Sequence, residues 1–224
     1  MNASVRVALD AMGGDHAPAA TIAGAVQAAR EYDVGVYLVG NEAAIRAELA
    51  KHDTRSLDLP IEHTDEVIPM DEHNPARAVR NKNTSMVRAL QLVVDGQAIA
   101  AVSAGNSGAM MAAASLVTLK RIPGVERAAI GGVLPTADGA VLIIDMGANT
   151  DCKPEFLQQF ALMGSIYMER IMRRPSPRVG LLSNGEEAGK GNQLVQETYQ
   201  LLSANAATLD LNFIGNVEGR DIFT

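Results

Sequence analysis

Five loops rich in Asp, Asn and Gly carry the side chains best suited to chemistry in this chain. Each follows a short apolar run that predicts a β-strand, and they occupy residues 10–16, 103–108, 145–149, 183–191 and 215–221. Loops of this composition bring backbone N–H groups and small polar side chains close to an anion or a reacting carbonyl group. In an open parallel sheet, ligands bind beyond the carboxyl ends of the strands. We therefore expect the five loops to converge on one site.

The apolar runs and the segments between them predict an α/β protein with a doubly wound, mostly parallel sheet. Strands are predicted at residues 5–9, 34–39, 59–61, 98–102, 129–134, 141–144, 179–182 and 211–214, and helices at residues 19–31, 42–52, 84–95, 107–119, 154–173 and 192–204. This alternation is typical of parallel sheets. Residues 135–139 have the length of a hairpin turn, so one antiparallel pair is expected. Residues 1–224 are expected to form one domain, with the polar residues 64–83 as a lid or inserted arm.

Composition narrows the classes of protein that this chain can belong to. A chain of 224 residues with 47% hydrophobic residues is typical of a packed globular protein, and a net charge of −7 argues against nucleic-acid binding. The single cysteine, Cys152, excludes an intramolecular disulfide and fits a reducing cytoplasm. No signal peptide is evident before the first predicted strand. Residues 96–119 lack charge, but the polar loop at 103–108 divides them into a buried strand and a buried helix.

The loop at residues 183–191 resembles a Walker A phosphate-binding loop but departs from it in two respects. The spacing between its glycines is one residue short, and Gly191 stands where Ser or Thr would hold Mg²⁺. A nucleoside-triphosphate site is therefore not expected. Lys190 still supplies a mobile positive charge before a helix that begins near Asn192, which suits phosphate or a developing oxyanion. The alternative is a solvated lysine at the start of a helix.

The loop at residues 10–16 lacks the Gly-x-Gly-x-x-Gly spacing of dinucleotide-binding folds, so NAD binding is not supported. Asp15 either caps the following helix or takes part in chemistry. His16 is either a general base or a structural residue.

The remaining motifs give weaker signals for other chemistry. Gly105 and Ser107 lie one residue too close together for the nucleophile elbow of a serine hydrolase. Asp145 has no companion ligands at metal-binding spacing, and Cys152 has no histidine at a recognisable offset. Basic residues cluster within residues 77–88, 120–127 and 170–178. These clusters are either docking surfaces for an acidic partner or solvated helix faces.

Taken together, the motifs in residues 8–18, 103–108, 145–149, 182–191 and 215–221 resemble those of the PlsX family, the phosphate:acyl-ACP acyltransferases of bacterial phospholipid synthesis. They occur in the family's order and span nearly the whole chain. The resemblance implies that acyl carrier protein (ACP) carrying an acyl group reacts with inorganic phosphate to give acyl phosphate and ACP. It also implies a cytoplasmic homodimer with peripheral membrane association and a fold akin to phosphotransacetylases and isocitrate dehydrogenases. Family members are longer, so the C-terminal part of the fold is expected to be missing here.

The residues of the five loops suit this chemistry. Phosphorolysis of a thioester needs an anion pocket and donors for the oxyanion, but no metal, no cofactor and no covalent enzyme intermediate, because phosphate is the nucleophile. The catalytic candidates are Lys190 for charge, Asn106 as a neutral donor and His16 for proton handling. The candidates for substrate and phosphate binding are Asp10, Gly13, Gly14, Asp15, Ser103, Gly105, Ser107, Asp145, Asn149, Asn184, Gly185, Glu187, Gly189, Gly191, Asn216 and Arg220.

Two other functions are alternatives to acyl transfer. An oxidoreductase of the isocitrate dehydrogenase type would need metal-binding aspartates and a nucleotide loop, and the sequence offers neither pattern. A non-catalytic metabolite-binding protein would keep the loops as a relic pocket. Phosphate-dependent turnover of acyl-ACP would distinguish acyl transfer from both of these alternatives.

Overall fold

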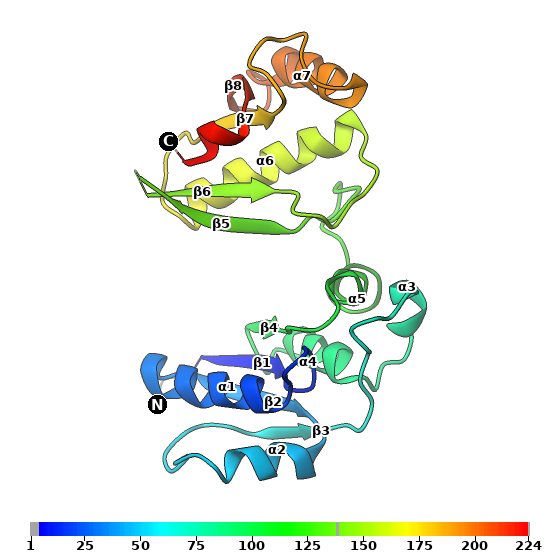
Figure 1. Ribbon diagram of the computed structural model, residues 1–224, viewed down its shortest axis with the longest axis vertical. Helices are drawn as coiled ribbons and strands as arrows, with labels where there is room; N and C mark the ends of the chain where they lie inside the picture. Colours follow the sequence, from blue (N-terminus) through cyan, green and yellow to red (C-terminus); the bar gives the residue numbers. More distant parts are fainter. Residues whose placement is uncertain (1–4, 138, 224) are drawn as a thin grey trace. The chain divides into compact units, whose positions relative to one another are not determined.

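The structure, a computed structural model, describes residues 5–137 and 139–223, which divide into two compact units (Figure 1). We call Met1–Ile122 the N-terminal unit and Pro123–Thr224 the C-terminal unit. The N-terminal unit is built on a parallel sheet whose strands lie in the order β3-β2-β1-β4. The strands are β1 (Arg6–Asp10), β2 (Gly35–Gly40), β3 (Ile61–His63) and β4 (Ala100–Val102).

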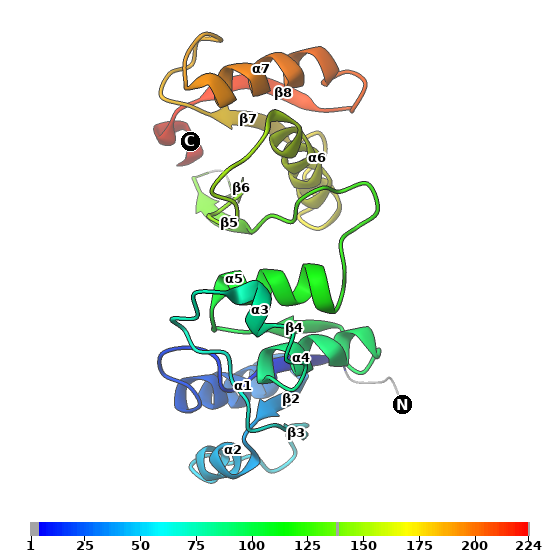
Figure 2. The same cartoon turned by 90° about the vertical axis from the view of Figure 1, so that its right-hand side faces the viewer.

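Helices cover both faces of this sheet, as the continuous apolar strands predict. Helices α1 (Ala19–Tyr32) and α2 (Glu42–Leu49) lie on one side of it and α4 (Ser85–Val94) on the other (Figure 2). Strand β2 shows both contacts, because Leu38 packs with α1 and α2 while Val39 packs with α4. Beyond α4, helix α5 (Ser107–Ala112) buries Ala109 and Ala112 in a third apolar cluster. The predicted doubly wound arrangement is confirmed here.

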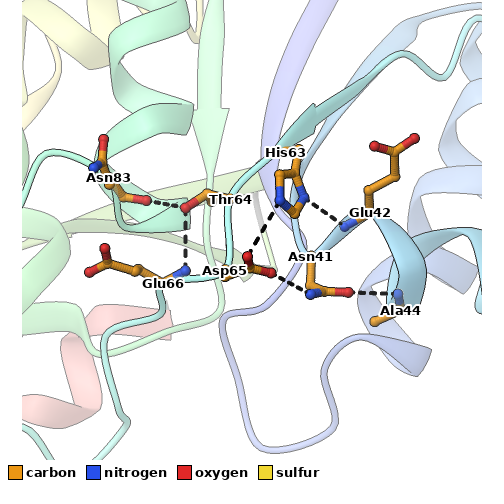
Figure 3. A network of polar contacts seen from close by, with 8 residues as sticks. All are labelled: Asn41, Glu42, Ala44, His63, Thr64, Asp65, Glu66 and Asn83. Carbon is orange, nitrogen blue, oxygen red and sulfur yellow. Dashed lines mark hydrogen bonds and ion pairs between the residues drawn. The ribbon is translucent and has the colours of Figure 1, made fainter.

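Residues 64–84 form an irregular segment, which we call the arm. It contains a short helix that the sequence analysis did not predict, α3 (Pro75–Ala78). The two ends of the arm are joined, because Glu66 forms a β-bridge with Thr84 and the Thr64 hydroxyl donates to the carbonyl of Asn83 (Figure 3). The first end is also joined to the start of α2, where the amide of Asn41 donates to Asp65 at 2.6 Å. The arm is therefore a loop with a fixed base.

Two predicted elements in the N-terminal unit have different limits in the structure. Strand β3 begins after Pro60, because proline has no N–H for the ladder. The helix predicted at residues 107–119 is α-helical only to Ala112 and continues as the π-helix η1 (Ala113–Val117). The N–H and the hydroxyl of Thr118 both donate to the carbonyl of Ala113 at 3.0 Å, which supports the wider turn. No helix in the described part of the chain is long and apolar enough to cross a membrane.

The C-terminal unit holds two separate pairs of strands and two long helices. Strands β5 (Gly131–Thr136) and β6 (Gly139–Ile144) form the predicted antiparallel hairpin, whose turn includes Asp138, a residue outside the described ranges. Strands β7 (Arg178–Leu182) and β8 (Asn212–Val217) pair in parallel. The other elements are α6 (Pro154–Arg170), α7 (Gln193–Asn205) and the 3₁₀-helix η2 (Gly219–Phe223).

Within residues 5–137 and 139–223 the strands therefore form three separate sheets, where one sheet with a single antiparallel pair was expected. Helix α6 packs against β6 and also contacts β7 and α7, while α7 packs against β8 (Figure 1). The buried apolar side chains in the described part of this unit come mainly from the helices and are Phe156, Phe160, Met168, Leu202 and Leu211.

Candidate active site

The loops after β1 and β4 are held together by a buried carboxylate. Asp10 ends β1 and is only 2% exposed. Its Oδ2 accepts a hydrogen bond from the Ser103 hydroxyl at 2.7 Å, and its Oδ1 accepts from the N–H of Met12 at 3.3 Å. The Ser103 oxygen in turn accepts from the N–H of Gly105 at 3.0 Å. The structure thus brings together two of the predicted loops at the carboxyl edge of the parallel sheet, as predicted.

Glycines allow these two loops to approach each other closely. A Cβ atom on Gly13 would overlap the Asp10 carboxylate, and Gly14 has a φ of +111°. Asp15 and His16 are exposed, and the structure gives neither side chain a hydrogen bond. The capping role considered for Asp15 is not found, because α1 begins after Pro18 without a side-chain cap.

Asn106 uses its side chain for structural contacts with α5 and with the arm, including a long hydrogen bond to the carbonyl of Glu72. Its Oδ1 accepts from the N–H of Ala109 at 2.9 Å and caps α5, and its Nδ2 donates to the carbonyl of Met70 in the arm at 2.9 Å. Ser107, the first residue of α5, is exposed, and its hydroxyl has no hydrogen bond within residues 5–137 and 139–223. Of these two neighbours, Ser107 is therefore the one with a donor free for a ligand.

The loop after β6 is a turn closed on itself. Asp145 accepts from the N–H of Ile130 and from the N–H of Asn149, each at 2.7 Å. The amide of Asn149 donates to Asp145 and to the carbonyl of Ala128. Nearby, burial and then the charge of Asp145 raise the pKa of the Cys152 thiol, which opposes formation of a nucleophilic thiolate. Among the described residues there is no group of three or more side chains that could hold a metal ion.

The loop between β7 and α7 holds an exposed cation beside a helix N-terminus. Asn184 closes the loop by accepting from the N–H of Gly191 at 3.0 Å, and Asn192 caps α7. Gly191 has a φ of +88°, which favours glycine. The stem of Lys190 lies over the buried Gly185. Its ammonium group has no hydrogen bond or ion pair with the residues that the structure describes, and it is thus available for an anion.

The loop after β8 is joined to this lysine-bearing loop. Asn216 is 5% exposed, and its Nδ2 donates to the carbonyl of Glu187 at 2.9 Å. Arg220 forms ion pairs with Glu186 at 2.8 Å and Glu218 at 2.9 Å. The hydrogen bond with Glu186 and the neighbouring carboxylates raise the pKa of the Arg220 guanidinium and engage its charge. Arg220 thus connects the two loops, while Gly189 of the same region has open space around it.

Sequence reasoning missed Ser183 as a candidate, although it opens the lysine-bearing motif. The backbone N–H of Ser183 donates to the carbonyl of Val217, so Ser183 lies at the end of the β7–β8 ladder. Its hydroxyl oxygen is buried and has no partner within the described residues, and the same holds for Oδ1 of Asn216. Buried polar atoms are rarely left unpaired. The register places both residues on the same face of the ladder, so two unpaired polar atoms lie beneath the loop that carries Lys190.

The predicted site residues therefore fall into defined groups. Asp10, Gly13, Ser103 and Gly105 meet in the N-terminal unit. In the C-terminal unit, Asn184, Glu187, Gly191, Asn216 and Arg220 belong to two joined loops, while Asp145 and Asn149 close a turn of their own. The convergence of all five loops on one site stays a prediction. Chemically, the first group positions backbone donors and the second presents a free cation.

Comparison with known proteins identifies relatives over nearly the whole chain. Residues 5–224 match the family model described as "Fatty acid synthesis protein". The phosphate acyltransferase of Herpetosiphon aurantiacus is 55% identical over 97% of this chain and 58% of its own length. The phosphate acyltransferase of Trichlorobacter lovleyi is 53% identical over 98% of this chain and 62% of its own length. The chain thus spans about three fifths of the length of these relatives.

The fold has a counterpart among solved structures. A phosphotransacetylase from Streptococcus pyogenes superimposes with a TM-score of 0.72 over 97% of this chain and 69% of its own, at 17% sequence identity. This likeness confirms the predicted phosphotransacetylase-like α/β fold. From the family match and the identity to its relatives, the chain belongs to the fatty acid synthesis protein family, the PlsX family whose motifs it carries.

Proposed function

We propose that the protein transfers an acyl group from acyl-ACP to inorganic phosphate. An oxygen of phosphate attacks the carbonyl carbon of the thioester, and a bond forms between that carbon and the attacking oxygen. The C–S bond then breaks, and the thiol leaves with the proton that phosphate gives up. The products are acyl phosphate and ACP. The identity to phosphate acyltransferases supports this reaction over an oxidoreductase of the isocitrate dehydrogenase type.

The observation that carries the proposal is the unpaired ammonium group of Lys190 before α7. The N-terminus of this helix of 13 residues adds a partial positive charge. An ammonium group at this position stabilises phosphate or the oxyanion of the tetrahedral intermediate. In the same unit, Asn184 and the glycine-rich backbone of the loop supply neutral donors. Ser107 as a donor and His16 as the carrier of the proton from phosphate belong to the N-terminal unit, and their part in the reaction stays a prediction.

The partners and the location belong to this proposal because the family resemblance implies them. The substrates are acyl-ACP and inorganic phosphate, and the protein acts as a homodimer in the cytoplasm with peripheral association at the inner face of the membrane. Light scattering of the full-length protein gives the oligomeric state. Co-sedimentation with phospholipid vesicles tests the association with membranes.

The test is a phosphate-dependent assay of the full-length protein. Acyl-ACP and phosphate are supplied, acyl phosphate is trapped with hydroxylamine, and the free thiol of ACP is measured in parallel. Equal amounts of acyl phosphate and thiol, with none formed when phosphate is omitted, are expected. Release of thiol without acyl phosphate would indicate a thioesterase, and absence of both products would leave the metabolite-binding alternative.

A further inference from the structure

The arm of the N-terminal unit itself lines a cleft that the acyl-transfer motifs do not include. The cleft has a volume of about 390 Å³, within the range of roughly 300–1,000 Å³ that is typical of small-molecule sites. Its lining is mixed. Apolar surface comes from Val67, Pro69 and Ala78, and polar groups come from residues that include Glu72, Asn74 and Arg77.

The polar groups of the cleft include donors without partners. The guanidinium group of Arg77 is exposed and has no hydrogen bond or ion pair within residues 5–137 and 139–223. Asn74 accepts from the backbone N–H of Arg77 at 3.2 Å through Oδ1, which leaves its amino group free among the same residues. Glu72 accepts from the N–H of Asn74 at 2.6 Å through one carboxylate oxygen. The cleft therefore offers three groups to a ligand: the guanidinium of Arg77 for an anion, the amide N–H groups of Asn74 as donors and the carboxylate of Glu72 as an acceptor.

The walls of the cleft are fixed by contacts with the rest of the unit. Ile68 and Val79 anchor the arm in the apolar cluster with α4 and α5, and they are 5% and 0% exposed. Figure 3 shows the polar network at the base of the arm, where Asp65 contacts both His63 and Asn41. Asn106 holds the other side of the arm through the carbonyl of Met70. A site with fixed walls binds without a large ordering cost.

We propose that this cleft binds the phosphopantetheine group through which ACP carries its acyl chain; the inference rests on the acyl-transfer function proposed above. This group combines a phosphodiester, two amides, a hydroxyl and a gem-dimethyl carbon, which together match the lining. Arg77 binds the phosphodiester through its planar fork. Asn74 and Glu72 bind amide and hydroxyl groups, and Val67 and Pro69 pack against the methyl groups. Asn106 joins the arm to α5 through the carbonyl of Met70, so the arm that lines the cleft is held beside the loop at residues 103–108.

Direct binding to the full-length protein tests the inference without turnover. Calorimetry compares 4′-phosphopantetheine with unphosphorylated pantetheine for the wild type and three variants. Val67→Trp places a large side chain at an exposed wall of the cleft, and we expect it to weaken binding of 4′-phosphopantetheine about tenfold or more. Arg77→Ala is expected to abolish most of the preference for the phosphorylated ligand. Arg80→Ala removes an exposed cation of the same arm that does not line the cleft, and affinity for 4′-phosphopantetheine should stay unchanged.

Turnover then separates this inference from the proposed function. Val67→Trp and Arg77→Ala should raise KM for acyl-ACP while kcat at saturation stays close to that of the wild type. Wild-type affinity for 4′-phosphopantetheine and wild-type KM in both variants would overturn the inference and leave acyl transfer standing. A wild type that makes no acyl phosphate, but loses 4′-phosphopantetheine binding on Val67→Trp, would support the cleft and overturn the reaction.

Discussion

In the N-terminal unit, the loops after β1 and β4 are held by a buried carboxylate, whereas in the C-terminal unit the loop after β7 is held by two uncharged amides, the exposed one of Asn184 and the buried one of Asn216. Asp10 is 2% exposed and bonded to Ser103, while Asn184 is exposed and bonded to the N–H of Gly191. The same difference appears in the cores. The three clusters of buried apolar residues that the structure describes all belong to the N-terminal unit.

This contrast shows that the two units differ in what their loops contribute: the loops of the N-terminal unit are fixed by a buried carboxylate, and the loops of the C-terminal unit present unpaired groups. Strands of the C-terminal unit leave apolar side chains exposed, with Leu182 at 52% and Ile214 at 46%. Its loops leave the ammonium of Lys190 and the hydroxyl of Ser183 without partners in the described residues. The buried hydroxyl costs stability while it is unpaired, whereas the exposed ammonium is solvated, and both groups remain free to bind a substrate. The N-terminal unit therefore contributes fixed geometry, and the C-terminal unit contributes groups that a ligand can engage.

The largest effect that tests this contrast is expected from Lys190→Ala in the full-length protein. Loss of a charge aimed at phosphate or the oxyanion should lower acyl phosphate formation by ~10²–10³. The melting temperature should not change, because the side chain is exposed and unpaired. Lys153→Ala is the control for loss of an exposed lysine near a helix N-terminus, since Lys153 directly precedes α6 and its ammonium lies over the Phe156 ring. Turnover of Lys190→Ala equal to that of the control would remove Lys190 from the mechanism.

Asp10→Ala should have the opposite effect to Lys190→Ala, because it should lower the free energy of unfolding. The change leaves the Ser103 hydroxyl and the N–H of Met12 without their acceptor, at a cost of about 1–3 kcal/mol. Urea unfolding measures the loss. Asp15→Ala in the same loop removes an exposed carboxylate and should change the free energy of unfolding by less than about 0.5 kcal/mol. Equal effects of the two substitutions would show that the buried carboxylate does not hold the loops.

Two glycine substitutions compare the space around the loops of the two units. Gly13→Ala forces a methyl group against the Asp10 carboxylate and should destabilise the protein by about 1–3 kcal/mol. Gly189→Ala places a methyl group in open space, so its effect should lie within about 0.5 kcal/mol of zero. Thermal unfolding of both variants gives the comparison. A loss for Gly189→Ala as large as that for Gly13→Ala would show that the C-terminal loop is packed as tightly.

The smallest effect concerns Cys152, whose thiol pKa is raised by burial and by the charge of Asp145. Because the folded state disfavours the thiolate, the stability contributed by this group is complete below the ordinary thiol pKa and is lost as pH rises through the raised pKa. Alkylation by iodoacetamide should therefore require a higher pH in the native protein than in urea. A native thiol that reacts at the same pH as the unfolded chain would contradict this local burial.

The sequence predicted those features that depend on strand order and on local pattern. The meeting of Asp10 with Ser103 follows from parallel strands that end at one edge, and the cap of α7 at Asn192 follows from local residue preference. The partners of Asn106 and Arg220 could not be predicted, because they depend on which distant backbone or carboxylate tertiary packing brings near. Helix α3 could not be predicted either, because it is too short to be stable by itself. The buried Val79 beside it stabilises the helix through tertiary contacts that the sequence does not reveal.

The hydrogen bond between Ser103 and Asp10 joins residues that are 93 positions apart in the chain. During synthesis, Asp10 in the loop after β1 therefore cannot bond to Ser103 until β4 has left the ribosome and joined the sheet. Within the described residues, all hydrogen-bond partners of this loop lie in the first of the two units, so its geometry needs no residue of the second unit. Domains that form first at the N-terminus fold in this way as independent units. The order of translation thus makes the partners of this loop available before the residues of the second unit leave the ribosome.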